Sequence, residues 1–178
     1  MVSESLWKQV KTADVFTLLN GIFGFSAILA SFQGNFPLGT AFILFAVIFD
    51  YLDGKIARLS KKASSLGKEL DSLADIISFG VAPAFLVYAL YPSWPVLVGG
   101  MLLLVAGMLR LARYNVREDA PAEQGEVNSH FIGMPITMNG FIFPLAVYLG
   151  LSPAFFPYLL LLSALLMVSS VRFRRFIH

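Results

Sequence analysis

Apolar runs of membrane-spanning length dominate the chain, and short polar segments separate them. Six of these runs are predicted to be transmembrane helices, over residues 15–32, 36–58, 68–91, 94–116, 133–150 and 153–171. Each is close to the roughly 20 residues that a helix needs to cross a bilayer. The pattern therefore predicts an all-α integral membrane protein, with a six-helix transmembrane domain over residues 15–178.

The segment before the first run, residues 1–14, has a different pattern. Leu6, Trp7 and Val10 fall on one helical face, and Lys8 and Lys11 lie beside it. This arrangement favours an amphipathic helix that lies on the membrane surface, the alternative being a frayed tail. The segment lacks an uninterrupted apolar core and a cleavage site, so we do not expect a signal peptide.

Composition agrees with a membrane protein and excludes other classes. Of the 178 residues, 57% are apolar and 13% are charged, whereas soluble domains carry about twice that share of charge. The chain has no cysteine, which excludes disulfides. Its net charge of +2 is too small to argue for nucleic-acid binding.

The distribution of basic residues predicts the orientation in the membrane. If the six helices alternate in direction, almost every lysine and arginine falls on one side, and the three opposite turns, QGNFP, YPSWP and GLSP, carry no charge. The positive-inside rule then places both termini at the cytoplasmic face of the cell membrane. The polar segment between the second and third helices is expected at the same face.

Four aspartates flank that polar segment: Asp50, Asp53, Asp71 and Asp75. The first two are three residues apart and share one helical face, and the last two are four apart and share another. Two helices joined by a short turn are expected to be antiparallel neighbours, so the carboxylates can converge. Because a carboxylate near hydrocarbon is costly, such residues are usually functional.

Converging carboxylates predict a divalent cation site. A site made only of oxygens suits Mg²⁺, Mn²⁺ or Ca²⁺ rather than zinc. Small residues, Gly54 and Ala57, continue the face of the first pair and leave room for a bulky ligand, and Arg58 follows directly. A metal beside an arginine is suited to gripping a diphosphate. The alternative is that the aspartates form structural ion pairs with arginines, although Arg58, Arg110 and Arg113 are too few to balance four acids.

With these residues in place, the stretch resembles the signature of the CDP-alcohol phosphotransferases, D-x2-D-G-x2-A-R-x8-G-x3-D-x3-D. Every fixed position and every gap is matched between residues 50 and 75. The resemblance implies six transmembrane helices, an N-terminal interfacial helix and a homodimer. It also implies transfer of a substituted phosphate from a CDP-linked donor to an alcohol, with release of CMP.

The same resemblance implies roles for individual residues. Asp50, Asp53, Asp71 and Asp75 would hold a pair of divalent ions, Mg²⁺ or Mn²⁺, and Asp75 would also be the general base. The residues that would bind the CDP part of the donor are Gly54, Ala57, Arg58, Ser64 and Gly67.

Three softer matches resemble the phosphatidylserine synthase branch: residues 16–25 (FTLLNGIFGF), 110–116 (RLARYNV) and 131–137 (FIGMPIT). They imply L-serine as acceptor and a CDP-diacylglycerol-type lipid as donor, with ester-linked and ether-linked (CDP-archaeol) forms both open. Ala13-Asp14 replaces the Pro-Asn pair that often precedes T-L-L-N. That leaves Thr17 and Asn20 as predicted donor contacts, or as partners of a neighbouring helix.

Arg110 and Arg113 share a face near the end of the fourth predicted helix. We expect them to bind the carboxylate of serine, the alternative being that they reach towards lipid headgroups.

Two other functions remain open from the sequence. Within the family, the acceptor could be glycerol 3-phosphate or inositol phosphate, for which the same arginines could serve. Outside it, a cation transporter could use the aspartates as an intramembrane relay, but the acids gather at one face and no charge lines a path to the other.

Overall fold

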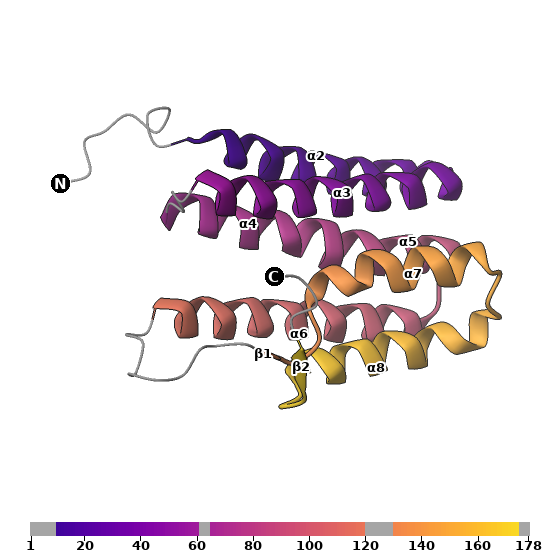
Figure 1. Cartoon of the computed structure of the whole chain (residues 1–178). Coiled ribbons are helices and arrows are strands. Elements are labelled where there is room, and N and C mark those ends of the chain that lie inside the picture. Colours follow the sequence, from indigo (N-terminus) through magenta and orange to yellow (C-terminus); the bar gives the residue numbers. More distant parts are fainter. Residues whose placement is uncertain (1–9, 61–64, 120–129, 175–178) are drawn as a thin grey trace.

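The computed structural model describes residues 10–60, 65–119 and 130–174, and these form a bundle of helices (Figure 1). The helices and strands, in chain order, are α2 (Thr12–Phe32), α3 (Phe36–Ser60), α4 (Ser65–Asp75), the π-helix η1 (Ile76–Val81), α5 (Ala82–Leu90), α6 (Trp94–Asp119), β1 (His130–Ile132), the 3₁₀ helix η2 (Ile136–Met138), α7 (Asn139–Tyr148), the 3₁₀ helix η3 (Pro153–Phe155), α8 (Phe156–Val168) and β2 (Arg172–Arg174).

Four helical segments are long and apolar enough to cross a membrane: Thr12–Phe32, Phe36–Leu59, Ser65–Leu90 and Trp94–Arg117. Two shorter apolar helices, Ile136–Tyr148 and Pro153–Val168, correspond to the fifth and sixth predicted spans. Both are shorter than predicted, because residues 133–135, which include Gly133 and Pro135, are not helical before the first of them, and residues 169–171 are not helical after the second. The first span begins at Thr12, so residues 12–14, assigned above to the interfacial helix, belong to α2. Residues 1–9 lie outside the described part of the chain.

Aromatic rings join the first two spans. The Phe23 ring of α2 lies 5.1–5.9 Å from the rings of Phe42, Phe45 and Phe49 on α3, measured between centroids. Such pairs contribute about 0.5–1.5 kcal/mol each beyond the area they bury. On the outward side of α2, Leu18, Ile22, Phe25 and Leu29 are exposed, as suits a lipid-facing surface.

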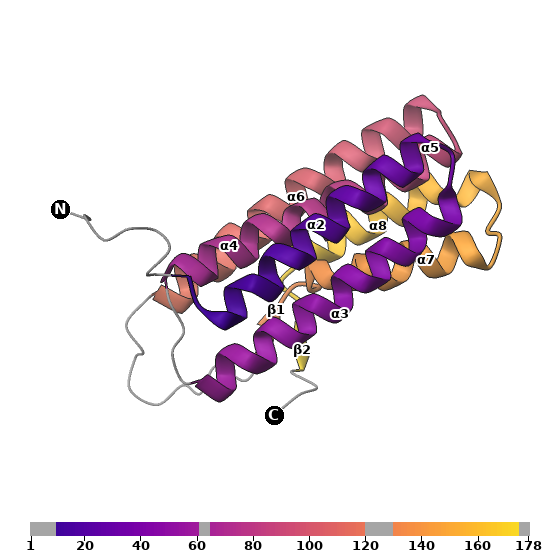
Figure 2. The same cartoon turned by 90° about the horizontal axis from the view of Figure 1, so that it is seen from above.

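The third predicted span, residues 68–91, divides into α4, η1 and α5, and these parts pack differently against α3. Figure 2 shows that α2 lies between the C-terminal end of α3 and the N-terminal end of α4, and α2 packs against both. Further along, α3 packs against η1, α5 and α7. The prediction that the two motif spans are neighbours is therefore confirmed through η1 and α5, while the aspartate-bearing faces of α3 and α4 meet beside α2.

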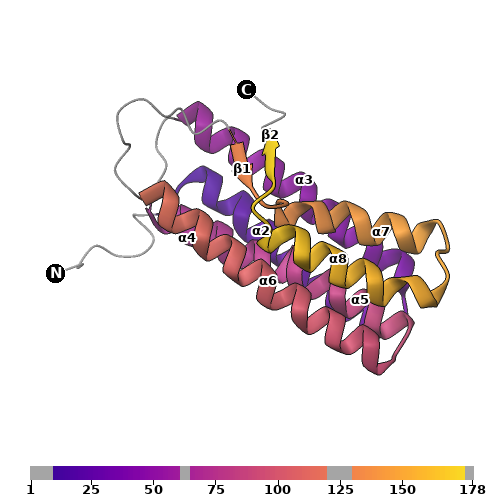
Figure 3. The same cartoon turned by 90° about the horizontal axis from the view of Figure 1, so that it is seen from below.

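A two-stranded antiparallel ribbon adds an exception to the all-α class. β1 pairs with β2, with Phe131 opposite Phe173, and Figure 3 shows the ribbon near the start of α7 and the end of α8. Directly after β1, Gly133 adopts a left-handed conformation with φ of 80°. An added Cβ there would lie 2.3 Å from the carbonyl oxygen of Met167, so both the conformation and the space require glycine.

Candidate active site

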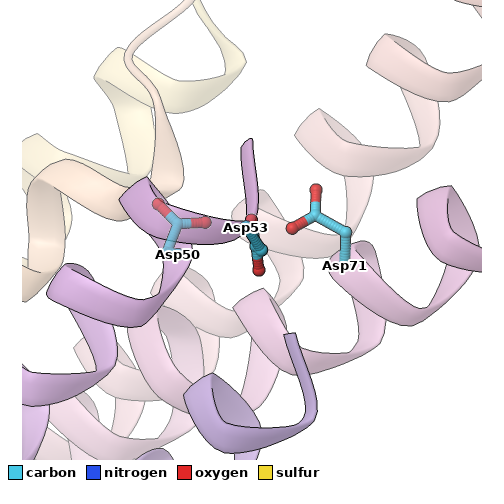
Figure 4. A group of neighbouring side chains, drawn as sticks. All are labelled: Asp50, Asp53 and Asp71. Atoms are coloured by element: carbon cyan, nitrogen blue, oxygen red, sulfur yellow. The ribbon is translucent and has the colours of Figure 1, made fainter. Parts of the chain in front are cut away.

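The four aspartates lie at the end of the bundle where α3 ends and α4 begins (Figure 1). One carboxylate oxygen from each of Asp50, Asp53 and Asp71 lies within 4.8 Å of the other two. Figure 4 shows the Asp53 side chain between the other two, with all three directed towards a common point. The prediction that the two halves of the motif converge is confirmed for these three.

Asp75, the last residue of α4, is the fourth acid of the cluster. Its side chain contacts Asp50 and is only 5% exposed. The Nδ2 of Asn20 donates a hydrogen bond to Oδ1 of Asp75 across 3.3 Å. The deepest of the four acids is thus held by a side chain from α2, which the motif does not include.

The donor set fits a divalent cation. Asp53 is 5% exposed, and its Oδ2 has no hydrogen-bond partner among the described residues. A buried carboxylate oxygen is normally hydrogen-bonded, and this unpartnered oxygen belongs to a carboxylate that lies beside two others. Three clustered carboxylates offer the hard oxygen ligands that Mg²⁺ and Mn²⁺ prefer.

Thr17 and Asn20, the two residues of α2 predicted to contact the CDP-linked donor, lie against this cluster. They are 3% and 0% exposed. The Thr17 hydroxyl contacts the Asp53 carboxylate and lies 3.3 Å from the carbonyl oxygen of Ala13. Both side chains therefore touch aspartates, and neither is presented to the outside.

The residues predicted to bind CDP lie around the open side. An added Cβ at Gly54 would meet no atom within 4 Å, so the helix surface is bare there. Ala57 and Gly67 are partly buried, and Arg58 is exposed. Ser64 lies outside the described residues. The structure thus leaves open space beside Gly54, and Arg58 is exposed one turn further along α3.

The two arginines predicted to bind the acceptor lie in different surroundings. Arg110 is 8% exposed, lies near Asp75 in the electrostatic field of the cluster, and its guanidinium sits 5.6 Å from the centroid of the Tyr114 ring. Arg113 instead donates to backbone carbonyls at the end of α8: Nη2 to Met167 at 3.0 Å and Nη1 to Val168 at 3.2 Å. Arg110 is thus brought near the carboxylates, and Arg113 is brought to the end of α8.

Sequence reasoning missed two residues at the site. Thr137, in η2, contacts the carboxylate of Asp50. It belongs to residues 131–137, which resemble the phosphatidylserine synthase branch but were assigned no role at the site. Ser78, in the π-helix that follows Asp75, donates to the backbone oxygen of Asn20 at 2.9 Å. No periodic signal marks a contact between residues 58 positions apart.

A second link ties α4 to α6 beside the cluster. Nζ of Lys68 donates to the Asn115 carbonyl oxygen at 3.0 Å, and Nδ2 of Asn115 donates to the Ser72 hydroxyl at 3.0 Å. Lys68 and Ser72 are one turn apart on α4, the turn that carries Asp71. These bonds fix that turn against the helix that carries Arg110.

Comparison with known proteins agrees with the motif. The profile of the CDP-alcohol phosphatidyltransferase family matches residues 10–172. The archaetidylserine synthase of Methanothermobacter thermautotrophicus is 36% identical, over 98% of this chain and 74% of its own length. CDP-diacylglycerol–serine O-phosphatidyltransferases are 34% identical in Bacillus subtilis, over 90% of this chain and 88% of that protein, and 36% in Saccharomyces cerevisiae, over 83% of this chain.

The chain spans about half of the yeast relative, since the aligned region covers 55% of that protein. The archaeal and Bacillus relatives are covered over most of their length. The expected family is confirmed by the match over nearly the whole chain, by the complete aspartate motif and by the apolar spans that carry it. The chain is a multi-pass membrane enzyme and belongs to the CDP-alcohol phosphatidyltransferase family.

Proposed function

We propose that the protein transfers the phosphatidyl group of a CDP-diacylglycerol-type lipid to the hydroxyl of L-serine, giving a phosphatidylserine-type lipid and CMP. The observation that carries the chemistry is the meeting of Asp50, Asp53 and Asp71 within 4.8 Å, with Asp75 beneath them. The names of the similar proteins, which are serine phosphatidyltransferases and an archaetidylserine synthase, support serine as acceptor.

In the proposed reaction the serine hydroxyl oxygen forms a bond to the lipid-bearing phosphorus of the donor. The bond between that phosphorus and the oxygen of CMP breaks, and the hydroxyl proton passes to Asp75. Asp75 suits this role because it is buried, directed into the cluster and held by Asn20. A base placed in this way typically contributes about 10²–10⁴-fold to the rate.

The aspartates would hold the divalent ions, Mg²⁺ or Mn²⁺, that the family resemblance implies as a pair. When bound, such ions neutralise a diphosphate and stabilise the charge on departing CMP. The unpartnered Oδ2 of Asp53 and the short separation of three carboxylates support this assignment.

The two substrates would approach from different sides of the cluster. The bare surface at Gly54, with exposed Arg58 four residues on, suits the diphosphate of the donor. Arg110 lies near Asp75 and can bind the carboxylate of serine, since arginine pairs well with planar anions. Arg113 has its contacts at the end of α8, so its predicted part in acceptor binding has less support.

We place the cluster at the cytoplasmic face of the cell membrane, with six transmembrane helices, both termini on the same side and an N-terminal interfacial helix. The absence of charge from the three turns at the opposite end supports this orientation. A site at the ends of the helices can take a lipid from the bilayer and serine from water. A homodimer is expected from the family resemblance.

The test is CMP release by the purified protein in detergent, from CDP-diacylglycerol and, separately, CDP-archaeol, with Mn²⁺ or Mg²⁺. Serine, glycerol 3-phosphate and inositol phosphate are each offered alone. We expect serine-dependent release that is lost in Asp75→Asn and retained in Glu69→Gln, which changes an exposed carboxylate on the same helix. Release with a phosphorylated alcohol only would refute serine as acceptor. No release with any acceptor or donor would refute the transfer, and metal-ion flux in liposomes would then test the transporter.

A further inference from the structure

We propose that Asn20 is a positioning residue for Asp75, rather than a contact of the CDP-linked donor. This inference rests on the proposed function, in which Asp75 is the general base. It assigns to α2 a part in the chemical step, whereas the resemblance of the T-L-L-N segment implied a part in binding.

The burial of Asn20 argues against contact with a donor. The residue is 0% exposed, so no ligand atom can reach it unless α2 moves away from the helices it covers. Its side-chain Nδ2 donates to Oδ1 of Asp75, at 3.3 Å and across 55 residues of chain. The other atom of the amide, Oδ1, has no hydrogen-bond partner among the described residues. Among the described residues, the buried side-chain amide of Asn20 therefore makes its hydrogen bond to Asp75.

The backbone around Asn20 is fixed to the segment that follows Asp75. Its carbonyl oxygen accepts the hydrogen bond from Ser78 at 2.9 Å. One turn along α2, Gly24 leaves no room: an added Cβ would lie 2.7 Å from the Cα of Ser78. The side chain and the main chain of Asn20 thus bind two residues about one turn apart, Asp75 and Ser78. Such a pair of contacts limits both sliding and rotation of that turn.

The chemistry of the amide suits a base that must gain a proton. An amide N–H can donate to a carboxylate oxygen whether the group is charged or has taken a proton on its other oxygen. Asn20 binds Oδ1 and does not occupy Oδ2, the other oxygen at which Asp75 can take the proton of the acceptor. The hydrogen bond need not break during transfer, so the oxygen that acts as base keeps its place.

Kinetics separate positioning from donor binding. We expect Asn20→Ala to lower kcat by roughly 10- to 100-fold, the scale of a misplaced catalytic group. The KM values for CDP-diacylglycerol and serine should stay within about twofold. The matched control is Ser31→Ala, because Ser31 is also buried on α2 and its hydroxyl bonds only within the helix, to Ala27 at 2.7 Å. We expect the control to keep kcat and both KM values. A raised KM for the donor with unchanged kcat would overturn the proposal.

A swapped pair tests the contact without turnover. Asn20→Asp places a second carboxyl against Asp75 and should lower the thermal unfolding midpoint, whereas Asp75→Asn keeps an oxygen that can accept from Asn20 and serves as the reference for the pair. The double variant Asn20→Asp/Asp75→Asn restores one amide and one carboxyl at the same contact. We expect its midpoint to recover towards that of the wild type while activity stays absent, since the base is now on the wrong helix.

These readouts distinguish a failed inference from a failed function. If the wild type releases no CMP with any acceptor, the proposed function is refuted, and the swap still decides the pairing of Asn20 with Asp75. Recovery of the midpoint upholds the pairing, and additive losses in the double variant overturn it. If the wild type is active and Asn20→Ala keeps the wild-type kcat, the proposal that Asn20 positions Asp75 is overturned, whatever the double variant shows.

Discussion

Replacing Arg113 should destabilise the fold rather than weaken serine binding. The guanidinium donates to three carbonyl oxygens at the end of α8, at 3.0 Å to Met167, 3.2 Å to Val168 and 3.5 Å to Ser169. The last carbonyls of a helix have no partner within the helix. A cation is also favoured there by the helix dipole. We therefore treat Arg113 as the cap of α8, supplied by α6.

The size of the effect follows from these bonds. A hydrogen bond to a charged group contributes about 1.5–3 kcal/mol. Two of the three bonds are short enough to count fully, but the side chain is partly exposed, so solvent screening places the total near roughly 2–3 kcal/mol. In a chain of this size about 1 kcal/mol corresponds to a midpoint change of about 2–4 °C, so Arg113→Ala should lower the midpoint by about 4–12 °C.

Thermal unfolding in detergent measures this directly. Arg113→Lys should fall between wild type and Arg113→Ala, because an ammonium cannot span several carbonyls as the planar fork does. Arg117→Ala is the matched control, since Arg117 lies one turn further along α6 and is exposed. We expect almost no change in its midpoint. Equal midpoints for the two alanine variants, with a raised KM for serine in Arg113→Ala alone, would refute the cap and favour the sequence-based prediction.

Three further predictions concern the site. Gly24→Ala should lower the free energy of unfolding by about 1–3 kcal/mol, because the added Cβ would lie 2.7 Å from the backbone of the π-helix. Gly54→Ala, whose added Cβ meets no described atom within 4 Å, should unfold as the wild type does but show a raised KM for the CDP-lipid. The reverse pattern would contradict both expectations. Thr137→Val removes the hydroxyl that contacts Asp50 and should raise the Mn²⁺ concentration for half-maximal activity by roughly tenfold. The control, Thr40→Val, removes a buried hydroxyl that has no partner in the described ranges and should leave that Mn²⁺ concentration unchanged. Equal responses of the two variants would argue against the contact between Thr137 and Asp50. Added Mn²⁺ should raise the unfolding midpoint of the wild type and not that of Asp53→Asn, whereas an equal rise in both would place the ion elsewhere.

The convergence of the aspartates could be predicted because it depends on local regularity. Spacings of three and four residues place side chains on one face of any helix, and the long apolar runs identify the helices. Three of the carboxylates meet as expected, although the third predicted span packs against α3 through η1 and α5 rather than along α4. Convergence needs only that two faces point at one space. It does not need the helices to touch along their length.

The partners of the arginines could not be predicted in the same way. Arg110 and Arg113 share a helical face by spacing, yet one lies near Asp75 and the other reaches the end of α8. Spacing determines where Cβ points, and a long side chain then takes the partner that the tertiary fold brings near. The ribbon formed by residues 130–132 and 172–174 is missed for a related reason, because its two strands are short and far apart in sequence.

The π-helix after Asp75 shows how the fold supports the proposed base beyond the end of its motif. In a regular α-helix the carbonyl oxygen of Phe79 would accept from the N–H of residue 83, but Pro83 has none. Nδ2 of Asn139, a 0% exposed residue on α7, donates to that oxygen instead, at 3.2 Å.

A freed carbonyl in a membrane helix must find such a partner, since lipid offers none. Asn20 of α2 and Asn139 of α7 therefore both form hydrogen bonds with the π-helix Ile76–Val81, through Ser78 and Phe79 respectively. Since π-turns are rare and recur at functional sites, the most economical account is that the wider turn sets the rotation of Asp75 relative to α5. The motif ends at residue 75, and the structure that gives its last aspartate a fixed direction begins at residue 76.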